Sequence, residues 1–127
     1  KIRTENKLSS KIITVFGCGG DRDPGKRPQM AQIAEAYSDQ AIVTSDNPRT
    51  EDPEKIISDI YKGFQSPVNH FKESDRMKAI KLCIAACEPE DILVIAGKGH
   101  ENYQILGTTK HPFDDRLIAK KELDRKT

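Results

Sequence analysis

The chain has 127 residues, the length of one domain with one hydrophobic core, and we expect residues 1–127 to form that domain. Its 21 basic and 20 acidic side chains leave a formal net charge of +1, and it has no tryptophan. This balance excludes the positive surface that nucleic acid or an anionic membrane requires, so we expect neither as a partner.

Short apolar runs alternate with segments of helical period, which is typical of a parallel sheet covered by helices. The predicted strands are 11–17, 40–45, 68–73 and 91–97, followed by an edge hairpin that pairs 103–107 with the residues around Thr108. Segment 91–97 is apolar throughout its middle, so we expect it to be central, and 68–73 to be peripheral. The predicted fold class is α/β, a Rossmann-like doubly wound, mostly parallel sheet of about six strands with an antiparallel edge hairpin.

Helices are expected between the strands and after the hairpin, and their caps and spacing can be read from local signals. The expected features, in chain order, are Met30, Ile33, Ala34 and Tyr37 at helical spacing; Asp52 as N-cap, Pro53 as first residue, Ile56, Ile57 and Ile60 buried, and an end near Gly63; Ser74 as N-cap with a stripe of Met77, Ile80, Ile84 and Cys87; and Asp114 as cap of a helix carrying Leu117, Ile118 and Leu123.

The cysteines, Cys18, Cys83 and Cys87, are odd in number, and the sequence shows no secretory or membrane-spanning apolar run. We therefore expect a cytoplasmic protein with reduced thiols. Cys83 and Cys87 are four residues apart on a predicted helix, but zinc needs more ligands than this pair supplies. Buried thiols are the preferred interpretation, and no metal site is predicted.

Three predicted strands end in loops rich in glycine, proline and charge: GCGGDRDPGKR (17–27), SDNPR (45–49) and GKGHEN (97–102). Ligands of a doubly wound sheet bind beyond the carboxyl ends of its strands, so parallel strands would bring these loops to one edge. The side chains brought together there would be Arg22, Asp46, Asn47, Arg49, Lys98, His100 and Glu101.

The glycine-rich segment approaches two nucleotide-binding motifs without completing either. From Gly20 to Lys26 the spacing is G-x-x-x-x-G-K, but Arg27 stands where a phosphate loop needs a serine or threonine hydroxyl for magnesium. The G-x-G spacing that starts at Gly17 is followed by Arg22 at the position of the third glycine. A general anion-binding loop at a helix N-terminus remains the alternative.

The convergent set mixes charges of both signs. Arg22 and Arg49 offer planar guanidinium groups for carboxylates, Asn47 offers an amide, and Glu101 can accept from an ammonium group, so the set suits a zwitterion. Two alternatives stay open: these charges pair with one another around a rim, and His100 is a structural hydrogen-bonding residue. No Ser-His-Asp or Cys-His arrangement is indicated, and no catalytic residue is predicted.

The segments FGCGGDRDPGKRP, TSDNPRTEDP and AGKGHENYQI closely resemble, in the same order, three blocks of the C-terminal domain of the Mur ligases that add meso-diaminopimelate to UDP-N-acetylmuramoyl-L-alanyl-D-glutamate. The resemblance runs from about residue 11 to the end, and in that family DNPR, here residues 46–49, marks the members that select diaminopimelate. It implies that Arg22 and Arg49 bind the carboxylates of that amino acid and that Gly97 and Glu101 bind its amino-acid end. The full set that it implies is Arg22, Asp46, Asn47, Pro48, Arg49, Gly97 and Glu101, with Lys98 and His100 nearby.

The resemblance also implies a cytoplasmic ligase of peptidoglycan precursor synthesis that uses ATP and Mg²⁺ to activate its nucleotide substrate before the amine attacks. In that family the UDP-sugar-binding and ATPase domains precede this one. We expect both to be absent from this chain, ATP and Mg²⁺ to bind mainly outside it, and the fragment to be inactive alone, with Lys26 or Arg27 as candidate nucleotide contacts. The alternative is a noncatalytic amino-acid or anion-binding regulatory module of the same fold. No oligomeric state is predicted.

Overall fold

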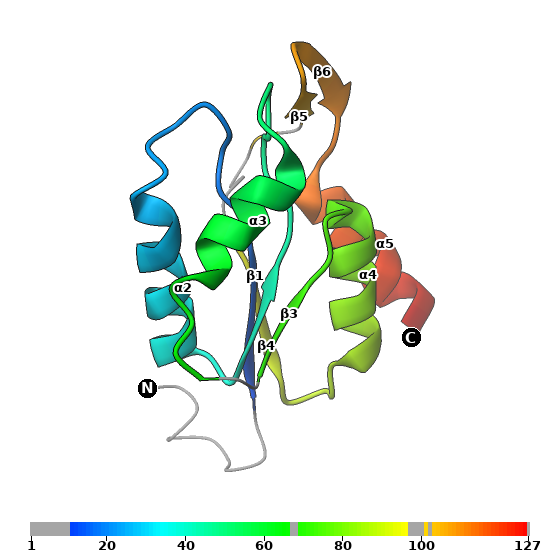
Figure 1. The fold of residues 1–127 in the computed structure, drawn as a ribbon. Coiled ribbons are helices and arrows are strands. Elements are labelled where there is room, and N and C mark those ends of the chain that lie inside the picture. The colour runs from blue at the N-terminus through cyan, green and yellow to red at the C-terminus, as the bar shows by residue number, and fades with distance from the viewer. Residues whose placement is uncertain (1–10, 67–68, 97–100, 102, 127) are drawn as a thin grey trace.

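The computed structural model describes residues 11–66, 69–96, 101 and 103–126 of the chain. Four strands form one parallel sheet in the order β3-β2-β1-β4: β1 (Ile12–Phe16), β2 (Gln40–Val43), β3 (His70–Lys72) and β4 (Ile92–Ile95). One face of this sheet carries α2 (Lys26–Tyr37) and α3 (Pro53–Tyr61), and the other carries α4 (Arg76–Ala86) and α5 (Asp115–Lys126) (Figure 1). The predicted α/β class and the parallel sheet are therefore confirmed.

The core lies on both faces of β1, because successive side chains of a strand point to opposite sides. Ile13 and Val15 pack in one buried cluster with Ala79 and Cys83 of α4. Phe16 belongs to the other cluster, which includes the buried residues of α2 and α3. Burial on both faces explains why β1 reads as a nearly continuous apolar run.

Local cap signals placed two helices correctly. Asp52 is the N-cap of α3, its carboxylate accepts a hydrogen bond from the Glu54 amide at 2.9 Å, and Pro53 is the first helical residue. Asp114 precedes α5 and accepts from the Arg116 amide at 2.9 Å. The predicted cap of α4 is wrong by one residue, because the carboxylate of Asp75 bonds the Lys78 amide at 3.1 Å.

The position predicted for segment 91–97 is wrong. Within the described residues β4 lies at an edge of the sheet, where it pairs with β1, and Val94 is 42% exposed. The central strand is β1, which pairs with both β2 and β4. An apolar run indicates that a strand packs against other elements, but it does not determine the position of that strand in the sheet.

The predicted hairpin is present as β5 (Tyr103–Leu106) and β6 (Thr109–Pro112). These strands form a separate two-stranded antiparallel sheet and do not extend the edge of the parallel sheet. The reason is the bonding of β5 to the loop after β2, which the next subsection describes.

Helix rotation also differs from the expected apolar stripes. Ile33 and Tyr37 of α2 are 61% and 66% exposed, and the buried side of that helix consists of Arg27, Ala31 and Ala34. Several other apolar residues of the predicted stripes are exposed as well: Met77, Leu117 and Leu123. No helix in the part of the chain that the structure describes is both long and apolar enough to cross a membrane.

Candidate functional site

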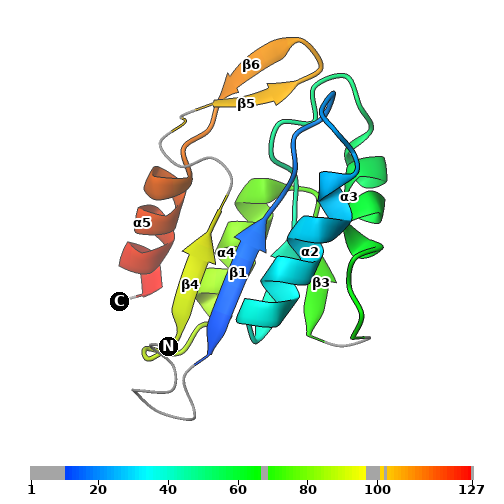
Figure 2. The same ribbon diagram turned by 90° about the vertical axis from the view of Figure 1, so that its left-hand side faces the viewer.

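The loops that follow β1 and β2 start side by side. β1 and β2 are parallel, with Phe16 opposite Val43, and the Thr44 amide donates to the Phe16 carbonyl at 2.9 Å. We name residues 17–25 the glycine loop and residues 44–52 the DNPR loop. Figure 2 shows both loops and the β5–β6 hairpin at the same end of the sheet, as the parallel arrangement predicts.

Gly20 joins the two loops at a close backbone approach. Its amide donates to the Asn47 carbonyl at 2.7 Å. A β-carbon at this position would lie 1.7 Å from the Pro48 carbonyl oxygen, so a side chain would force the two backbones apart. The glycine is therefore required by the contact between the loops.

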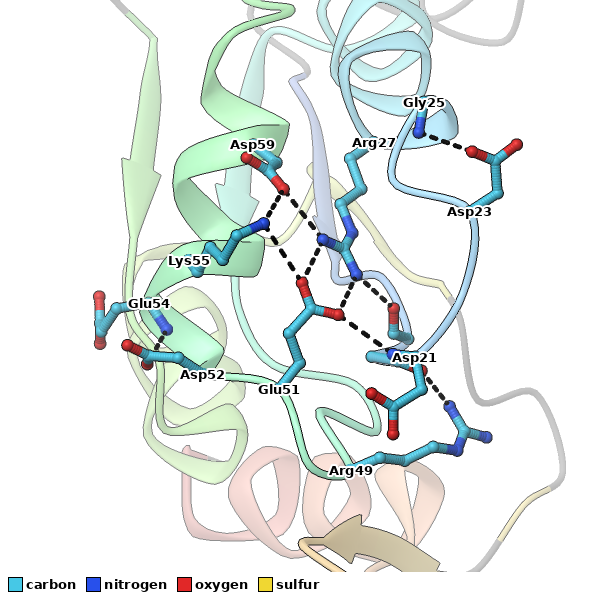
Figure 3. A network of polar contacts seen from close by, with 12 residues as sticks. Asp21, Asp23, Gly25, Arg27, Arg49, Glu51, Asp52, Glu54, Lys55 and Asp59 are labelled. Atoms are coloured by element: carbon cyan, nitrogen blue, oxygen red, sulfur yellow. Dashed lines mark hydrogen bonds and ion pairs between the residues drawn. The ribbon is translucent and has the colours of Figure 1, made fainter.

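A buried arginine, Arg27, forms hydrogen bonds with both loops and with α3 (Figure 3). Arg27 is 1% exposed, and its two terminal nitrogens bond the two oxygens of Glu51 at 2.7 and 2.8 Å. The same guanidinium donates to Asp59 of α3 at 2.9 Å and to the Gly19 carbonyl at 3.1 Å. The hydrogen bonds from Arg27, followed by one from the backbone of Asp21, lower the pKa of Glu51 to about 2.

Asp21 adds a second link between the loops. Its amide donates to Glu51 Oε1 at 3.1 Å, and its carboxylate accepts from the Thr50 hydroxyl at 2.8 Å. Its backbone is left-handed, with φ 55°, which is uncommon for a residue with a side chain. The carboxylate of Asp21 therefore helps to hold the two loops together.

Arg49 projects from the DNPR loop toward the glycine loop, and its φ of 55° is also left-handed. Its Nη1 donates to the Gly20 carbonyl at 3.1 Å and more weakly to the Asn47 carbonyl at 3.4 Å. A β-carbon on Gly19 would lie 3.0 Å from Arg49 Nη1 and 3.4 Å from Arg22 Cγ, so both arginines flank Gly19. Within the described residues neither arginine pairs with a carboxylate. For these two side chains, the alternative in which the charges of the site pair with one another is therefore not supported.

The β5–β6 hairpin holds the DNPR loop from its other side. The Arg49 amide donates to the Ile105 carbonyl at 3.1 Å, and the Ile105 amide donates to Asn47 Oδ1 at 2.9 Å. Gln104 donates to the Asp46 carbonyl at 2.8 Å. Asn47 is 5% exposed, so its side-chain oxygen has a structural role that its position in the motif did not predict.

A pocket of about 440 Å³ opens beside the glycine loop. Its charged lining comes from Arg22, Asp23, Lys26, Arg27 and Asp46, and Cys18 contributes to its apolar wall. Burial is the main cause that raises the pKa of Cys18 to about 11, so this thiol stays protonated near neutral pH and is not an activated nucleophile. A small mixed-charge pocket suits the binding of a zwitterion and does not by itself provide a reaction.

The remaining predicted site residues are less fully placed. Gly97, Lys98 and His100 lie outside the described residues. Glu101 is described and half-buried just before β5. Pro48 is buried in the DNPR loop, where its carbonyl accepts from the Glu51 amide at 3.0 Å. Their contact with an amino acid stays a prediction.

The described residues do not fit a nucleotide triphosphate and its metal. Arg27 occupies the position of the phosphate-loop hydroxyl and is committed to Glu51 and Asp59, so it is not available as the nucleotide contact suggested for it. No group of at least three histidine, cysteine, aspartate or glutamate side chains in the described ranges could hold a metal ion. Lys26 is exposed in the pocket lining, and its contact with a nucleotide stays a prediction.

The sequence patterns did not identify Arg27 or Arg76 as structural residues, although both are 1% exposed. A usable signal exists in the helical spacing. Arg27 lies four residues before the buried Ala31, and Arg76 lies four before the buried Ile80. An arginine on the same face of a helix as its buried apolar residues indicates an internal ion pair. This indication can be used only when the buried face of the helix has been predicted correctly.

Comparison with known proteins identifies the class to which this fold and site belong. Residues 2–99 match the family profile described as Mur ligase, glutamate ligase domain, and the chain belongs to the Mur ligase family. The resemblance of the three loop segments to the C-terminal domain of that family is confirmed.

Several similar proteins carry one particular name. The chain is 58% identical over 120 residues to UDP-N-acetylmuramoyl-L-alanyl-D-glutamate--2,6-diaminopimelate ligase of Fusobacterium nucleatum. The matched segment covers 94% of this chain and 25% of that relative. The chain is also 58% identical over 116 residues to the protein of that name from Synechococcus sp. strain WH7803, covering 91% of this chain and 23% of the relative. A solved structure of a protein with this name has a TM-score of 0.89 and 47% identity, covering 93% of this chain and 24% of that one. The chain thus spans about a quarter of the length of these relatives.

Proposed function

We propose that this chain supplies the amino-acid pocket of an ATP-dependent cytoplasmic ligase that adds meso-diaminopimelate to UDP-N-acetylmuramoyl-L-alanyl-D-glutamate in peptidoglycan precursor synthesis. Membership in the Mur ligase family and the names of the relatives support the reaction class. The substrate with the UDP-sugar, ATP and Mg²⁺ would bind mainly to parts of the ligase outside this chain, because the described residues form neither a phosphate loop nor a metal cluster.

The observation that carries this proposal is the pair of arginines around Gly19. Diaminopimelate has an amino-acid centre at each end and hence two carboxylates. Arg22 and Arg49 present two guanidinium groups that have no carboxylate partner among the described residues. A guanidinium pairs with a carboxylate through two parallel hydrogen bonds, which gives orientation as well as affinity.

The loop conformation supports a role for the Arg49 side chain in ligand binding. A left-handed φ of 55° costs less with glycine or asparagine than with arginine. Such local strain is concentrated at functional sites, where the surrounding structure holds it in place. Here two loops and the hairpin impose the conformation on Arg49.

In this function the chain binds and orients the attacking amino acid. The network around Arg27 holds the two loops together before the ligand arrives, so binding does not have to order them. The guanidinium groups would fix the carboxylates, and the acidic groups, Asp46 and Glu101, would face the ammonium groups. Correct placement of the amine contributes to rate by positioning.

The test compares two amino acids in the complete ligase. Amide formation is measured with UDP-N-acetylmuramoyl-L-alanyl-D-glutamate, ATP and either meso-diaminopimelate or L-lysine. Lysine carries two amino groups at the same spacing but lacks the second carboxylate. We expect ATP-dependent product with diaminopimelate and a much lower kcat/KM with lysine. Equal use of both amino acids would contradict the assignment of the arginines. Binding of diaminopimelate in calorimetry without amide formation would favour the noncatalytic module instead.

A further inference from the structure

A second buried arginine, Arg76, makes its side-chain hydrogen bonds to residues that do not line the pocket. Arg76 begins α4 and is 1% exposed. Its Nε and Nη2 bond the two carboxylate oxygens of Asp115 at 2.8 and 2.7 Å. Asp115 is the first residue of α5 and is 5% exposed, so this ion pair is withdrawn from solvent on both sides.

The same guanidinium also bonds two backbone carbonyls at the carboxyl ends of two strands. Nη1 donates to the Ser45 carbonyl at 3.0 Å, and Nη2 donates to the Ala96 carbonyl at 3.0 Å. Ser45 immediately precedes the DNPR motif. Ala96 follows β4 and immediately precedes the third loop predicted from the sequence, which begins at position 97. One side chain therefore holds Ser45, the first residue of one predicted substrate loop, and Ala96, the residue before another.

This bridge joins strands that are not neighbours. In the sheet order β3-β2-β1-β4, β1 separates β2 from β4, so no ladder of backbone hydrogen bonds connects those two strands. A buried charge pair is costly to desolvate, and an apolar pair of similar volume would often be at least as stable. An apolar side chain, however, could not donate to both carbonyls, which would then be left without these partners.

We propose that the Arg76–Asp115 ion pair is a positioning unit that sets the separation of Ser45, just before the DNPR motif, from Ala96, just after β4, and that it thereby determines affinity and selectivity for a diamino dicarboxylic acid. This inference rests on the proposed function. Arg76 acts through the Ser45 and Ala96 carbonyls, so it is a positioning residue and not a catalytic one. Its loss should affect the amino acid far more than the other two substrates, because displacement of a binding group by about 1 Å is enough to cost on the order of 10²-fold in rate.

The test uses steady-state kinetics of the complete ligase carrying Arg76→Lys or Asp115→Asn. A lysine keeps the charge, but it cannot span a carboxylate and two carbonyls with the geometry of a guanidinium. We expect Arg76→Lys to raise KM for meso-diaminopimelate on the order of 10-fold, while KM for ATP and for the UDP-linked substrate changes by less than about 2-fold. Asp115→Asn, which keeps the shape, should shift KM in the same direction by less, and it provides the test if the lysine variant does not fold.

The matched control is Ile84→Ala in the same helix. Ile84 is 3% exposed and lies near the other end of α4 from Arg76, so the substitution removes core packing and leaves the ion pair in place. It should lower the melting temperature and leave KM for meso-diaminopimelate unchanged. If Arg76→Lys and Asp115→Asn match this control in KM, or raise KM for all three substrates equally, the positioning role is wrong. Absence of diaminopimelate-dependent turnover in the unmodified ligase would instead overturn the proposed function.

Discussion

Buried and partly exposed arginines have different roles in this domain. Arg27 and Arg76 are each 1% exposed and bond carboxylates together with backbone carbonyls. Arg22 is exposed and Arg49 is half-buried, and neither pairs with a carboxylate of the described residues. The buried guanidinium groups fix backbone positions, and the other two remain available for the carboxylates of a ligand.

Arg49→Ala in the complete ligase should lower kcat/KM for meso-diaminopimelate on the order of 10²-fold, which corresponds to about 2–3 kcal/mol for a charge-assisted bidentate contact. Arg49→Lys should recover only part of this loss, because an ammonium group lacks the planar pair of donors. Arg125→Ala is the control, since Arg125 is an exposed arginine of α5 whose partner is Glu122. If Arg49→Ala lowers the melting temperature but leaves the kinetics unchanged, Arg49 is only a structural residue of the turn.

Glu51→Gln should change how the stability of the chain depends on pH. The carboxyl of Glu51 has a pKa of about 2 in the folded chain and an ordinary value of 4.5, so its charged form stabilises the fold fully above about pH 5. That contribution falls as the pH drops below 4.5 and is gone near pH 2. Melting temperatures across this range should fall steeply for the unmodified chain, whereas the glutamine variant should start lower at neutral pH and fall less.

Glu90→Gln is the control for that measurement, because Glu90 is an exposed glutamate in the turn before β4. It should reproduce the steep acid dependence of the unmodified chain. A Glu51→Gln variant with the same slope as the control would show that the bond to Arg27 does not couple proton binding to folding.

At the scale of elements, features with local causes were predicted and features with tertiary causes were not. α3 was predicted with its cap, first residue and buried isoleucines because Asp52 and Pro53 act within one helical turn. The edge position of β4 and the rotation of α2 depend on which surfaces other elements cover, and no local pattern contains that information. The hairpin was predicted from its own residues, but its docking on the DNPR loop depends on Asn47, a residue 58 positions earlier than its partner Ile105.

The same division applies to the candidate site. The convergence of the glycine loop and the DNPR loop follows from parallel strands and was predicted from that parallel arrangement. The means by which they are joined was not, because Arg27, Glu51 and Asp59 come from separate segments and read individually as ordinary surface charges. A charged residue reveals a buried partner only when the fold is known.

Gly20→Ala should separate the two loops. The added β-carbon would lie 1.7 Å from the Pro48 carbonyl oxygen, and since the obstacle is backbone the loops must shift, at a cost of about 1–3 kcal/mol in unfolding free energy. Affinity for meso-diaminopimelate, measured by calorimetry on the complete ligase, should fall with it. Gly25→Ala is the matched control, because its β-carbon would meet only the end of the Asp23 side chain at 3.2 Å and its φ of −65° suits alanine. Equal effects of the two substitutions would show that the contact of Gly20 with Pro48 is not required.

At the scale of the whole molecule, and on the proposed function, the domain separates the binding of an amino acid from chemistry on a nucleotide. Its sheet places the glycine loop, the DNPR loop and the carboxyl end of β4 at one end. Two buried arginines join them: Arg27 links the glycine loop to the DNPR loop, and Arg76 links the DNPR loop to Ala96. The contacts of Arg27, which Figure 3 shows, hold the charged lining of the pocket beside the glycine loop in place. The described residues of the domain form no complete phosphate loop, because Arg27 fills the position where such a loop carries its hydroxyl, and they include no metal cluster.

The 127-residue chain alone should therefore hydrolyse no ATP and form no amide, whereas the complete ligase should do both. Transfer of a phosphoryl group depends on a phosphate-binding loop and a metal ion that together stabilise the developing charge, and a single exposed lysine, Lys26, does not replace them. Release of inorganic phosphate should be measured for the purified chain with ATP and Mg²⁺, in the presence and absence of meso-diaminopimelate, and compared with buffer alone. Lys26→Ala serves as the diagnostic variant because Lys26 is the lysine of the incomplete motif. Steady phosphate release by the chain that this substitution abolishes would show that the glycine loop is a working nucleotide site, and the division between the chain and the rest of the ligase would be wrong.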